Sequence, residues 1–317
     1  MKSGRFGIDA TASSEVGPPP EGLAAFYWHF IRQTKGWYAA MFAASLAVAL
    51  LDTVIPLFIG RLVSLMEAVD RPAALAADRH VLIGMVALVL LVRPAAILID
   101  VVIRQYALIP GATSLIRWQS HWHVVRQNWP FFQNDFAGRI ANRVMQTASS
   151  LRESTMSSIR AVWYIGVYGT TAFALMTIAD WRLGLPMLVW VAGYVLLLRF
   201  FVPRLRELAR VSSEGRSLVM GRVVDSYTNI LTVKLFGRLK DEDAYVREAM
   251  DGHYDAMRSH LGMITKFQSC LTLLNAALLV ATAAIGLTLW GQGVIAAGVV
   301  ATALPLAWQT ADRKSVV

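Results

Sequence analysis

Apolar stretches long enough to cross a lipid bilayer alternate with polar stretches along most of this chain. A transmembrane helix needs about 20 mainly apolar residues. Six windows meet or approach that length, and the last is the shortest: residues 38–65, 81–102, 161–179, 183–202, 267–290 and 294–308. These windows lack the alternation of a barrel strand, and an open strand would leave backbone groups unpaired in hydrocarbon. The pattern predicts an all-α membrane protein with six transmembrane helices.

Composition and charge narrow the class of protein further. Of the 317 residues, 56% are hydrophobic and 16% are charged, which is outside the usual range of soluble domains. The net charge of +9 does not indicate nucleic-acid binding, because the Lys and Arg residues lie in loops between the apolar windows. The single cysteine, Cys270, excludes an internal disulfide framework and a C-x-x-C site.

The distribution of cations predicts which loops face the cytoplasm. Residues 104–160 carry seven Arg against two acidic residues, and residues 204–266 carry eleven Lys and Arg against nine acidic residues. The connections on the other side are short, and residues 61–79 carry three charges of each sign. Cytoplasmic loops are enriched in Lys and Arg, so both long loops and the N-terminus are predicted to be cytoplasmic.

The loop of residues 204–266 is predicted to extend far from the membrane. No proline lies between Pro203 and Pro305, so spans four and five can continue as unbroken helices. Two arms of about 25 residues each would project roughly 35 Å, at about 1.5 Å per residue.

The residues before the first span divide into two parts. Residues 1–21 contain Pro18, Pro19 and Pro20 and are predicted to be a disordered tail. Residues 22–36 mix aromatic side chains with Arg32 and Lys35, a mixture typical of a short helix that lies on the membrane surface.

Two short amphipathic segments occupy the middle of the long loops. They are FFQNDFAGRIANRVMQTASSLRES at residues 131–154 and DSYTNILTVKLFGR at residues 225–238. An apolar surface held away from the bilayer needs a covering partner, and an amphipathic helix commonly docks in a partner's groove. The alternative is that both segments only cap their loops.

At these residues the chain resembles the transmembrane domain of an ABC exporter, from about residue 25 to residue 309. The first loop of that family reads as an aromatic pair, glycine, an aliphatic residue and arginine. The second reads as an acid, an aliphatic residue, Thr-Val-Lys and an aromatic residue. The matching positions are Phe131, Phe132, Gly138, Ile140, Arg143, Asp225, Ile230, Thr232, Val233, Lys234 and Phe236.

The resemblance implies a function and a set of partners. Residues 22–310 would form the membrane half of an ATP-driven exporter in a bacterial inner membrane, with residues 22–36 as its elbow helix. The matching loop residues would be the coupling segments that contact nucleotide-binding domains. The other implied partners are the lipid bilayer, a second transmembrane subunit in a homo- or heterodimer, and a small-molecule or lipid cargo.

Departures from the family pattern limit what is carried over. The family often has Asp where this chain has Thr147, and Glu and Gly where it has Asp225 and Asn229. The sequence has no G-x-x-x-x-G-K-[ST] phosphate loop, and residues 311–317 do not match the family's continuation, as in a truncated tail. We therefore expect the nucleotide-binding domain to be absent, so this chain is no enzyme by itself. It would bind no metal or cofactor, and ATP and Mg²⁺ would bind the partner domains.

Three ionisable residues within the first two spans are candidates for the translocation pathway: Asp52, Arg93 and Asp100. Charged groups in a span are costly and usually face a cavity or one another. Arg93 and Asp100 are seven residues apart, so they share one helix face, and Asp52 is a possible partner of Arg93. A structural ion pair is the competing interpretation.

Other features favour ordinary interpretations. His121 and His123 lie on different helix faces without neighbouring acidic or thiol ligands, which favours solvated histidines over a metal site. Aromatic residues such as Trp190 are predicted to belong to an interfacial belt rather than to a substrate cavity. Two alternatives to transport stay open: a six-span scaffold or sensor, and an inert truncated fragment of a transporter.

Overall fold

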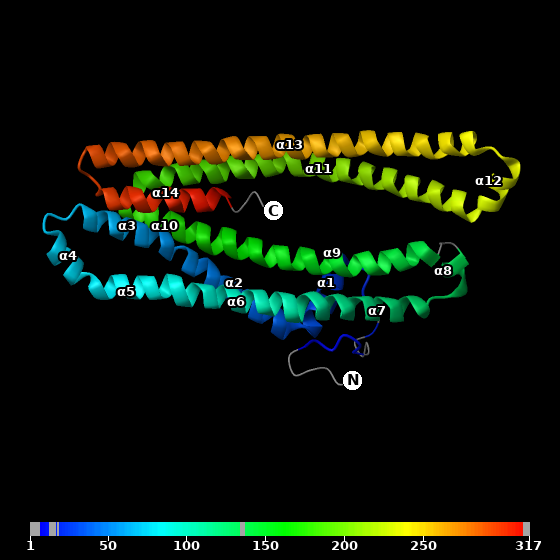
Figure 1. Cartoon of the computed structure of the whole chain (residues 1–317), viewed down its shortest axis with the longest axis horizontal. Helices are drawn as coiled ribbons and strands as arrows, with labels where there is room; N and C mark the ends of the chain where they lie inside the picture. Colours follow the sequence, from blue (N-terminus) through cyan, green and yellow to red (C-terminus); the bar gives the residue numbers. More distant parts are fainter. Residues whose placement is uncertain (1–6, 13–16, 18, 134–136, 313–317) are drawn as a thin grey trace. The chain divides into compact units, whose positions relative to one another are not determined.

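The computed structural model of the chain describes residues 7–12, 17, 19–133 and 137–312. Every secondary-structure element in this part of the chain is a helix, which confirms the all-α prediction. The chain forms two units, one of Met1–Ala179 with Leu289–Leu306 and the other of Asp180–Thr288 with Ala307–Val316. Each unit is described by itself below (Figure 1).

The first unit begins with the predicted surface helix and three spans. The surface helix is α1 (Leu23–Gln33), and α2 (Lys35–Asp52) and α3 (Val54–Met66) form the first span. The second span is one long run: α5 (Arg79–Ala87), π-helical η1 (Leu88–Val92), α6 (Arg93–Val102), π-helical η2 (Ile103–Ala112) and α7 (Thr113–Val125). The short α4 (Arg71–Ala77) precedes it. After α8 (Trp129–Gln133), the third span consists of α9 (Ala137–Trp163), π-helical η3 (Tyr164–Tyr168) and α10 (Gly169–Ala179).

The second unit is a long helical hairpin. The helix α11 (Trp181–Thr228) has 48 residues and α13 (Leu239–Gly291) has 53, and the short α12 (Ile230–Phe236) joins them. Figure 1 shows α11 and α13 running side by side with α12 at one end. At about 1.5 Å per residue, each helix is longer than 70 Å, about twice the thickness of the hydrocarbon layer. The unbroken helices predicted from the missing prolines are confirmed.

Among the described residues, five helical stretches are long and apolar enough to cross a membrane: Lys35–Met66, Arg79–Val125, Ile140–Ala179, Trp181–Thr228 and Leu239–Gly291. They contain the first five predicted windows. The sixth window falls mainly in α14 (Ala297–Asp312), which has 16 residues. It begins after a turn in which Gly293 has φ = 75°.

The helix α1 is fixed to the first arm, which we define as residues 104–160. Phe30 is 2% exposed and packs in a cluster with Ile116 of α7 and with Ala148 and Leu151 of α9. Tyr27 Oη lies 2.7 Å from Ser154 Oγ. The amides of Gln33 and Gln119 donate to each other's oxygens over 3.0 and 2.6 Å. Three helices therefore share this part of the core.

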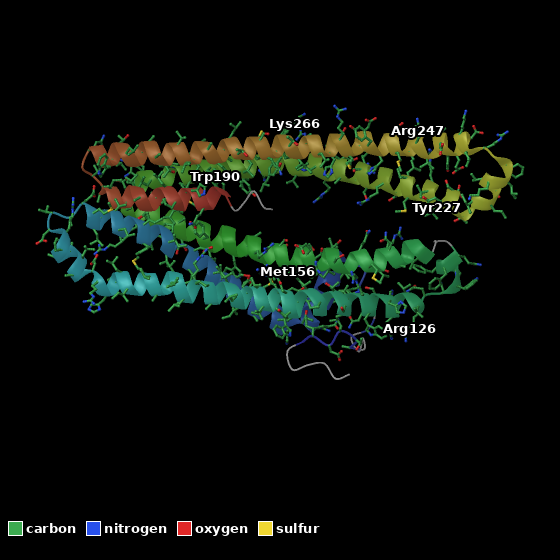
Figure 2. All side chains as sticks on the ribbon, in the orientation of Figure 1. Arg126, Met156, Trp190, Tyr227, Arg247 and Lys266 are labelled. Atoms are coloured by element: carbon green, nitrogen blue, oxygen red, sulfur yellow. The ribbon has the colours of Figure 1, made fainter. Side chains whose placement is uncertain are left out.

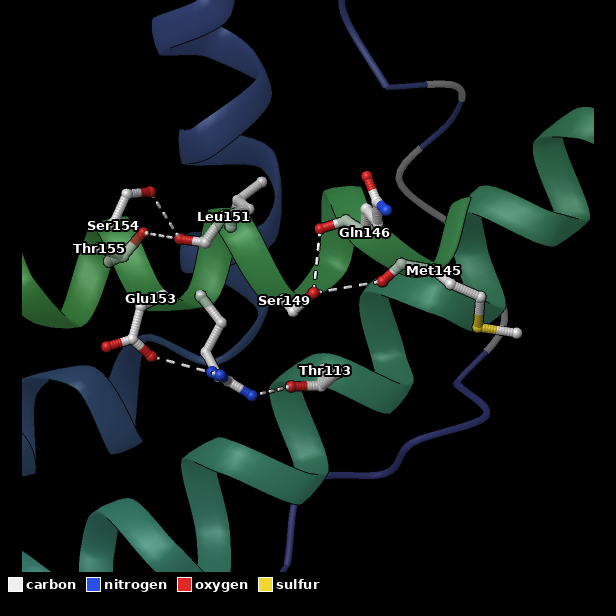
Figure 3. Close-up of polar contacts among 9 residues, drawn as sticks. Thr113, Met145, Gln146, Ser149, Leu151, Glu153, Ser154 and Thr155 are labelled. Atoms are coloured by element: carbon white, nitrogen blue, oxygen red, sulfur yellow. Dashed lines mark hydrogen bonds and ion pairs between the residues drawn. The ribbon is translucent and has the colours of Figure 1, made fainter. Parts of the chain in front are cut away.

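Polar bonds also connect α7 to α9 directly (Figure 3). Arg152 Nη1 donates to Thr113 Oγ1 over 2.9 Å, and Arg152 Nη2 lies 3.3 Å from Glu153 Oε2. The hydroxyls of Ser149 and Thr155 bond to carbonyls one turn back within α9. The guanidinium of Arg152 on α9 thus links this helix to α7.

Part of the predicted disordered tail has a defined contact in the structure. Ile8 packs against the cluster formed by Tyr38, Met41, Leu108 and Met156. A Cβ atom added to Gly111 would lie 2.7 Å from the Cβ atom of Ile8. Glycine at position 111 therefore leaves the space that Ile8 fills.

Two glycines allow α3 and α14 to cross closely within the first unit. A Cβ atom at Gly60 would lie 2.5 Å from the carbonyl oxygen of Gly298, and one at Gly298 would lie 2.5 Å from that of Gly60. Ser64 and Thr302, one turn further along each helix, border the contact. Small residues four apart are the usual means by which membrane helices approach each other.

The belt interpretation is wrong for Trp190. Its side chain is 1% exposed in the second unit, and its indole Nε1 donates to Asn275 Oδ1 of α13 over 2.9 Å. The ring stacks on Tyr194 with centroids 5.5 Å apart. A buried indole needs such a partner, and Asn275 is too distant in sequence for the composition of the span to reveal it. Figure 2 labels Trp190.

Candidate functional site

The helix α12 lies at the tip of the second arm, which we define as residues 204–266. The helix α11 stops at Asn229, whose backbone N–H donates to Asp225 O over 3.0 Å and whose side-chain Nδ2 donates to Asp225 Oδ1 over 2.9 Å. At the other end of α12, Gly237 has φ = 63° and donates to Val233 O. This left-handed conformation favours glycine. Asp225 thus stabilises the turn before α12, and Gly237 forms the turn after it.

Most of the side chains on α12 face away from the rest of the unit. Leu231, Leu235 and Phe236 are 69%, 74% and 76% exposed. Thr232 and Lys234 are exposed as well, and Val233 is half-buried. Exposed apolar clusters rimmed by polar residues mark interaction sites. We call Ile230, Leu231, Thr232, Lys234, Leu235 and Phe236 the α12 surface.

A set of bonds below α12 fixes the ends of α11 and α13 to each other. Arg222 Nη1 lies 3.0 Å from Glu248 Oε2 and also donates to the carbonyl of Tyr245. The Arg222 guanidinium carbon lies 4.4 Å from the centroid of the Tyr245 ring. One turn closer to the tip, Ser226 donates to Glu242. We call these five residues the Arg222 clasp.

The tip of the first arm presents a smaller surface. Phe131 and Phe132 on α8 are 39% and 38% exposed, and their rings pack edge to face with centroids 5.3 Å apart. Gly138 and Arg143 on α9 are exposed too. Ile140 is buried, with 7% exposure, so its side chain packs inside this chain. The intervening part of the motif, residues 134–136, lies outside the described residues.

The structure therefore collects the predicted coupling residues at two tips, with Ile140 and Val233 turned at least partly inward. The sequence analysis missed the Arg222 clasp. Arg222 precedes Glu248 by 26 residues, and only the fact that α11 and α13 reverse at α12 brings them together. Counting equal distances outward from residue 235 along both predicted helices would have suggested this pair.

The three ionisable residues of the first two spans form a ladder between α2 and α6. Arg93 Nε donates to Asp52 Oδ1 over 2.9 Å. Asp100 accepts from Ser45 Oγ over 3.0 Å and from Arg104 Nε over 2.9 Å. Ser45 precedes Asp52 by seven residues in α2, and Arg93 precedes Asp100 by seven residues in α6. The contacts Ser45–Asp100 and Asp52–Arg93 are therefore about two helical turns apart. The carboxylates of Asp52 and Asp100 are buried, so each is stabilised in the span by an arginine.

The ladder coincides with irregularities in the helices. The break between α2 and α3 follows Asp52 directly, and Pro56 lacks the N–H that would bond to the Asp52 carbonyl. Arg93 follows the π-helical segment η1, and η2 begins at residue 103. Such π-helical segments are frequent at functional sites. The ladder is thus placed where both helices are locally irregular.

The remaining candidates stay apart from these sites. His123 Nε2 lies 2.9 Å from Gln127 Nε2, and the ring of His121 lies 6.4 Å from that of Trp118. Among the described residues, no three His, Cys, Asp or Glu side chains gather as they would around a metal ion.

The chain matches known proteins over most of its length. A family model described as the ABC transporter transmembrane region matches residues 38–309. A protein of Haemophilus influenzae named "Uncharacterized ABC transporter ATP-binding protein" is 30% identical over 290 residues, which are 91% of this chain. The chain spans about half of that relative, 47% of its length.

Proposed function

Because this chain belongs to the family of ABC transporter transmembrane regions, we propose that it is the membrane half of an ATP-driven exporter and that its arm tips couple it to nucleotide-binding domains. The membership makes the chain a multi-pass membrane protein, and nucleotide-binding partners are part of the proposal. The observation that carries the proposal of coupling is the α12 surface. This surface is a cluster of apolar side chains at the tip of the second arm. Hydrogen bonds at Asn229 and Gly237 fix the two ends of its helix.

The chemistry of the α12 surface fits a groove in a partner domain. Leu231, Leu235 and Phe236 supply apolar area, and Lys234 adds a cation in the last turn of the helix. Amphipathic helices bind partners by laying such a face into an apolar groove. The Arg222 clasp would transmit a force on α12 to both long helices, because it joins α11 to α13 directly below the tip.

In this proposal, the energy for transport comes from the partner domains. ATP with Mg²⁺ would bind there and favour one arrangement of the arms. Nucleotide can shift the equilibrium only by binding that arrangement more tightly than the other. The rigid α11 and α13 would then carry the movement from the tips to the spans and switch the access of a central cavity.

The polar ladder is the proposed place at which the cargo contacts the moving spans. The ion pair of the buried Asp52 and the half-buried Arg93 joins the first two spans at their irregular segments. A polar or charged group of a cargo could exchange with the Asp100–Arg104 pair. A purely structural role for the ladder predicts instead that its removal lowers stability without changing transport of a folded protein.

The division into two units supports a dimer. The helices α11 and α12 and nearly all of α13 belong, with the end of α14, to a unit separate from the first three spans, as expected if spans four and five exchange toward a second transmembrane subunit. The cations of residues 104–160 and 204–266 support a bacterial inner membrane location with both arms in the cytoplasm.

The test is vanadate-sensitive ATPase activity and cargo transport in liposomes that contain the chain and a co-expressed nucleotide-binding domain. We expect Lys234→Glu and Phe236→Ala to uncouple ATP hydrolysis from transport. The matched controls Arg216→Glu and Tyr254→Ala alter exposed residues of the same arm away from its tip and should change neither. If the tip variants and the control variants had the same ATPase and transport activities, coupling through α12 would be refuted. If ATP had no effect on transport in any variant, a scaffold would be favoured.

A further inference from the structure

A hollow of about 610 Å³ lies between the helices of the second arm. Leu208 of α11 forms one side, and Ser259, Gly262 and Met263 of α13 form the other. Three charged residues of α13 complete it: Asp255, Arg258 and Lys266. Figure 2 labels Lys266 near the middle of α13. The hollow belongs entirely to the second unit and is separate from the α12 surface.

Gly262 forms a notch in the lining of the hollow. Arg258 is four residues before Gly262 and Lys266 is four residues after it, so the three share one face of the helix. A Cβ atom built on Gly262 would meet nothing within 4 Å, so the missing side chain leaves open space. Helical side chains lean toward the N-terminus of their helix, so Lys266 leans over the turn that contains Gly262.

The two cations at this notch have no ion-pair partner in the part of the chain that the structure describes. Among the described residues, neither Arg258 nor Lys266 has a carboxylate oxygen within ion-pair distance, in contrast to Arg222 and Arg210 on the same arm. Asp255 contributes one carboxylate at the end of the hollow nearer the tip. The hollow therefore has an excess of positive charge, and an anion with apolar surroundings would complement it.

The position of the hollow along the arm indicates the source of that anion. The rings of Phe201 and Phe267 meet with centroids 5.4 Å apart, and the apolar spans begin at this level. Gly262 precedes Phe267 by five residues, or about 7 Å. The headgroup layer of a bilayer is also about 5–7 Å thick on each side. The notch thus lies at the depth of lipid phosphates, and Leu208 and Met263 offer apolar contact beside it.

We propose that this hollow binds the phosphate of an anionic phospholipid of the adjacent leaflet, with Lys266 and Arg258 on either side of the phosphate. Cationic clusters beside a span attract anionic lipids, and here the notch at Gly262 gives the headgroup a place to enter. The inference depends on the proposed function in one respect, because it requires that the second arm leaves the membrane at Phe201 and Phe267.

The test uses the purified 317-residue chain in detergent micelles and native mass spectrometry. Phosphatidylglycerol and phosphatidylcholine with identical acyl chains are titrated separately. We expect preferential binding of phosphatidylglycerol. Lys266→Gln should weaken it about fivefold, the effect of one cation near an anionic surface, and Gly262→Leu should remove the preference by filling the notch. Binding of phosphatidylcholine should not change.

Two control variants lie on the same helix. Gly252→Leu also places a side chain where nothing lies within 4 Å, and Lys240→Gln removes an exposed cation far from the hollow. Both should bind phosphatidylglycerol as the unmodified chain does. If Gly262→Leu fails to elute as a folded protein in size-exclusion chromatography, the affinities of Lys266→Gln and Lys240→Gln for phosphatidylglycerol are compared instead. The proposal then requires that only Lys266→Gln binds this lipid more weakly.

Four results would overturn the proposal. They are equal affinity for both lipids, an equal loss in the variants and their controls, complete displacement of phosphatidylglycerol by inorganic phosphate, and cross-linking of residue 262 to a second copy of the chain without any lipid effect. The third would indicate a site for soluble anions, and the fourth would indicate a subunit contact. The assay contains no nucleotide or nucleotide-binding domain, so its outcome is distinguishable from a failure of ATP-driven transport.

Discussion

The first arm is braced by a third helix, whereas the second arm consists of two long helices joined by side-chain bonds near its tip. In the first arm, α1 packs Phe30 into α7 and α9 and adds the bonds of Tyr27 and Gln33. In the second arm, the Arg222 clasp joins α11 to α13 near the tip, and the rings of Phe201 and Phe267 meet just outside the arm at its base. The apolar residues at the second tip are also the more exposed.

This difference suggests a division of roles. An arm with its own core holds its shape without a partner, because burial of apolar area stabilises it. An arm with an exposed apolar tip and few internal contacts gains most when a partner covers it. We therefore expect the second arm to open more readily in the isolated chain and to be stabilised more by a nucleotide-binding domain.

The largest expected effect comes from removing the brace of the first arm. Phe30→Ala would leave a cavity among Ile116, Ala148 and Leu151, and such truncations cost about 3–5 kcal/mol. Hydrogen exchange of residues 145–155 should accelerate accordingly, while exchange of α12 should not change.

The control for this variant is Trp28→Ala. Trp28 lies on the same helix but is 60% exposed, so the expected change is below about 0.5 kcal/mol. Equal exchange in both variants would mean that the cluster around Phe30 does not stabilise the first arm, and the contrast between the arms would then be lost.

An intermediate effect is expected from the Arg222 clasp. Arg222→Ala removes an ion pair, a bond to the Tyr245 carbonyl and a cation–π contact. Because Glu248 is largely exposed and screened by water, we expect a cost of only about 1–2 kcal/mol. Faster hydrogen exchange in α12 and at the start of α13 would report it.

The comparison variant for the clasp is Arg216→Ala, which removes an exposed arginine from the same helix. It should leave the exchange of α12 unchanged. If Arg222→Ala also had no effect, the tip would be held by the hairpin backbone alone, and transmission of force through the clasp would be ruled out.

The smallest expected effect is a pH dependence of the brace. Burial lowers the pKa of His29 below its usual value of 6.5, and the nearby Arg32 lowers it further. The unfolded chain therefore binds a proton more readily than the folded one at pH values between the two pKa values. This contribution to the stability of α1 is complete above about pH 6.5 and is lost as the pH falls through the folded-state pKa.

Hydrogen exchange of residues 26–33 measures this dependence, after correction for the intrinsic exchange rate. Between about pH 7.5 and about pH 5.5, the free energy of local opening should decrease. His29→Gln should remove the decrease. An unchanged dependence in that variant would assign it to other groups.

The sequence predicted the spans and the long helices for clear physical reasons. Apolar windows of bilayer length and the absence of proline between residues 203 and 305 are local properties, and both are readable without a structure. The π-helical segments η1 and η2 were not predictable in this way, because their extra residues depend on how α6 packs on α2. The defined position of Ile8 likewise depends on a gap at Gly111, far along the chain.

In the candidate site, the local motif was predictable and the contacts between helices were not. The pattern around Thr232, Val233 and Lys234 located α12, and its exposure follows from a position at the tip of a hairpin. The Arg222 clasp, the bond from Trp190 to Asn275 and the hollow at Gly262 each need the register between α11 and α13. That register is a tertiary property that no local pattern contains.

The crossing of α3 and α14 has a mechanical consequence. At Gly60 and Gly298 the two backbones approach closely, and the nearest side-chain atoms of the facing helix are the hydroxyls of Thr302 and Ser64. The hydroxyl-bearing Ser64 and Thr302 on either side resist sliding along the axis. A displacement of α3 along its own axis would therefore be transmitted at this crossing to the part of α14 around Gly298.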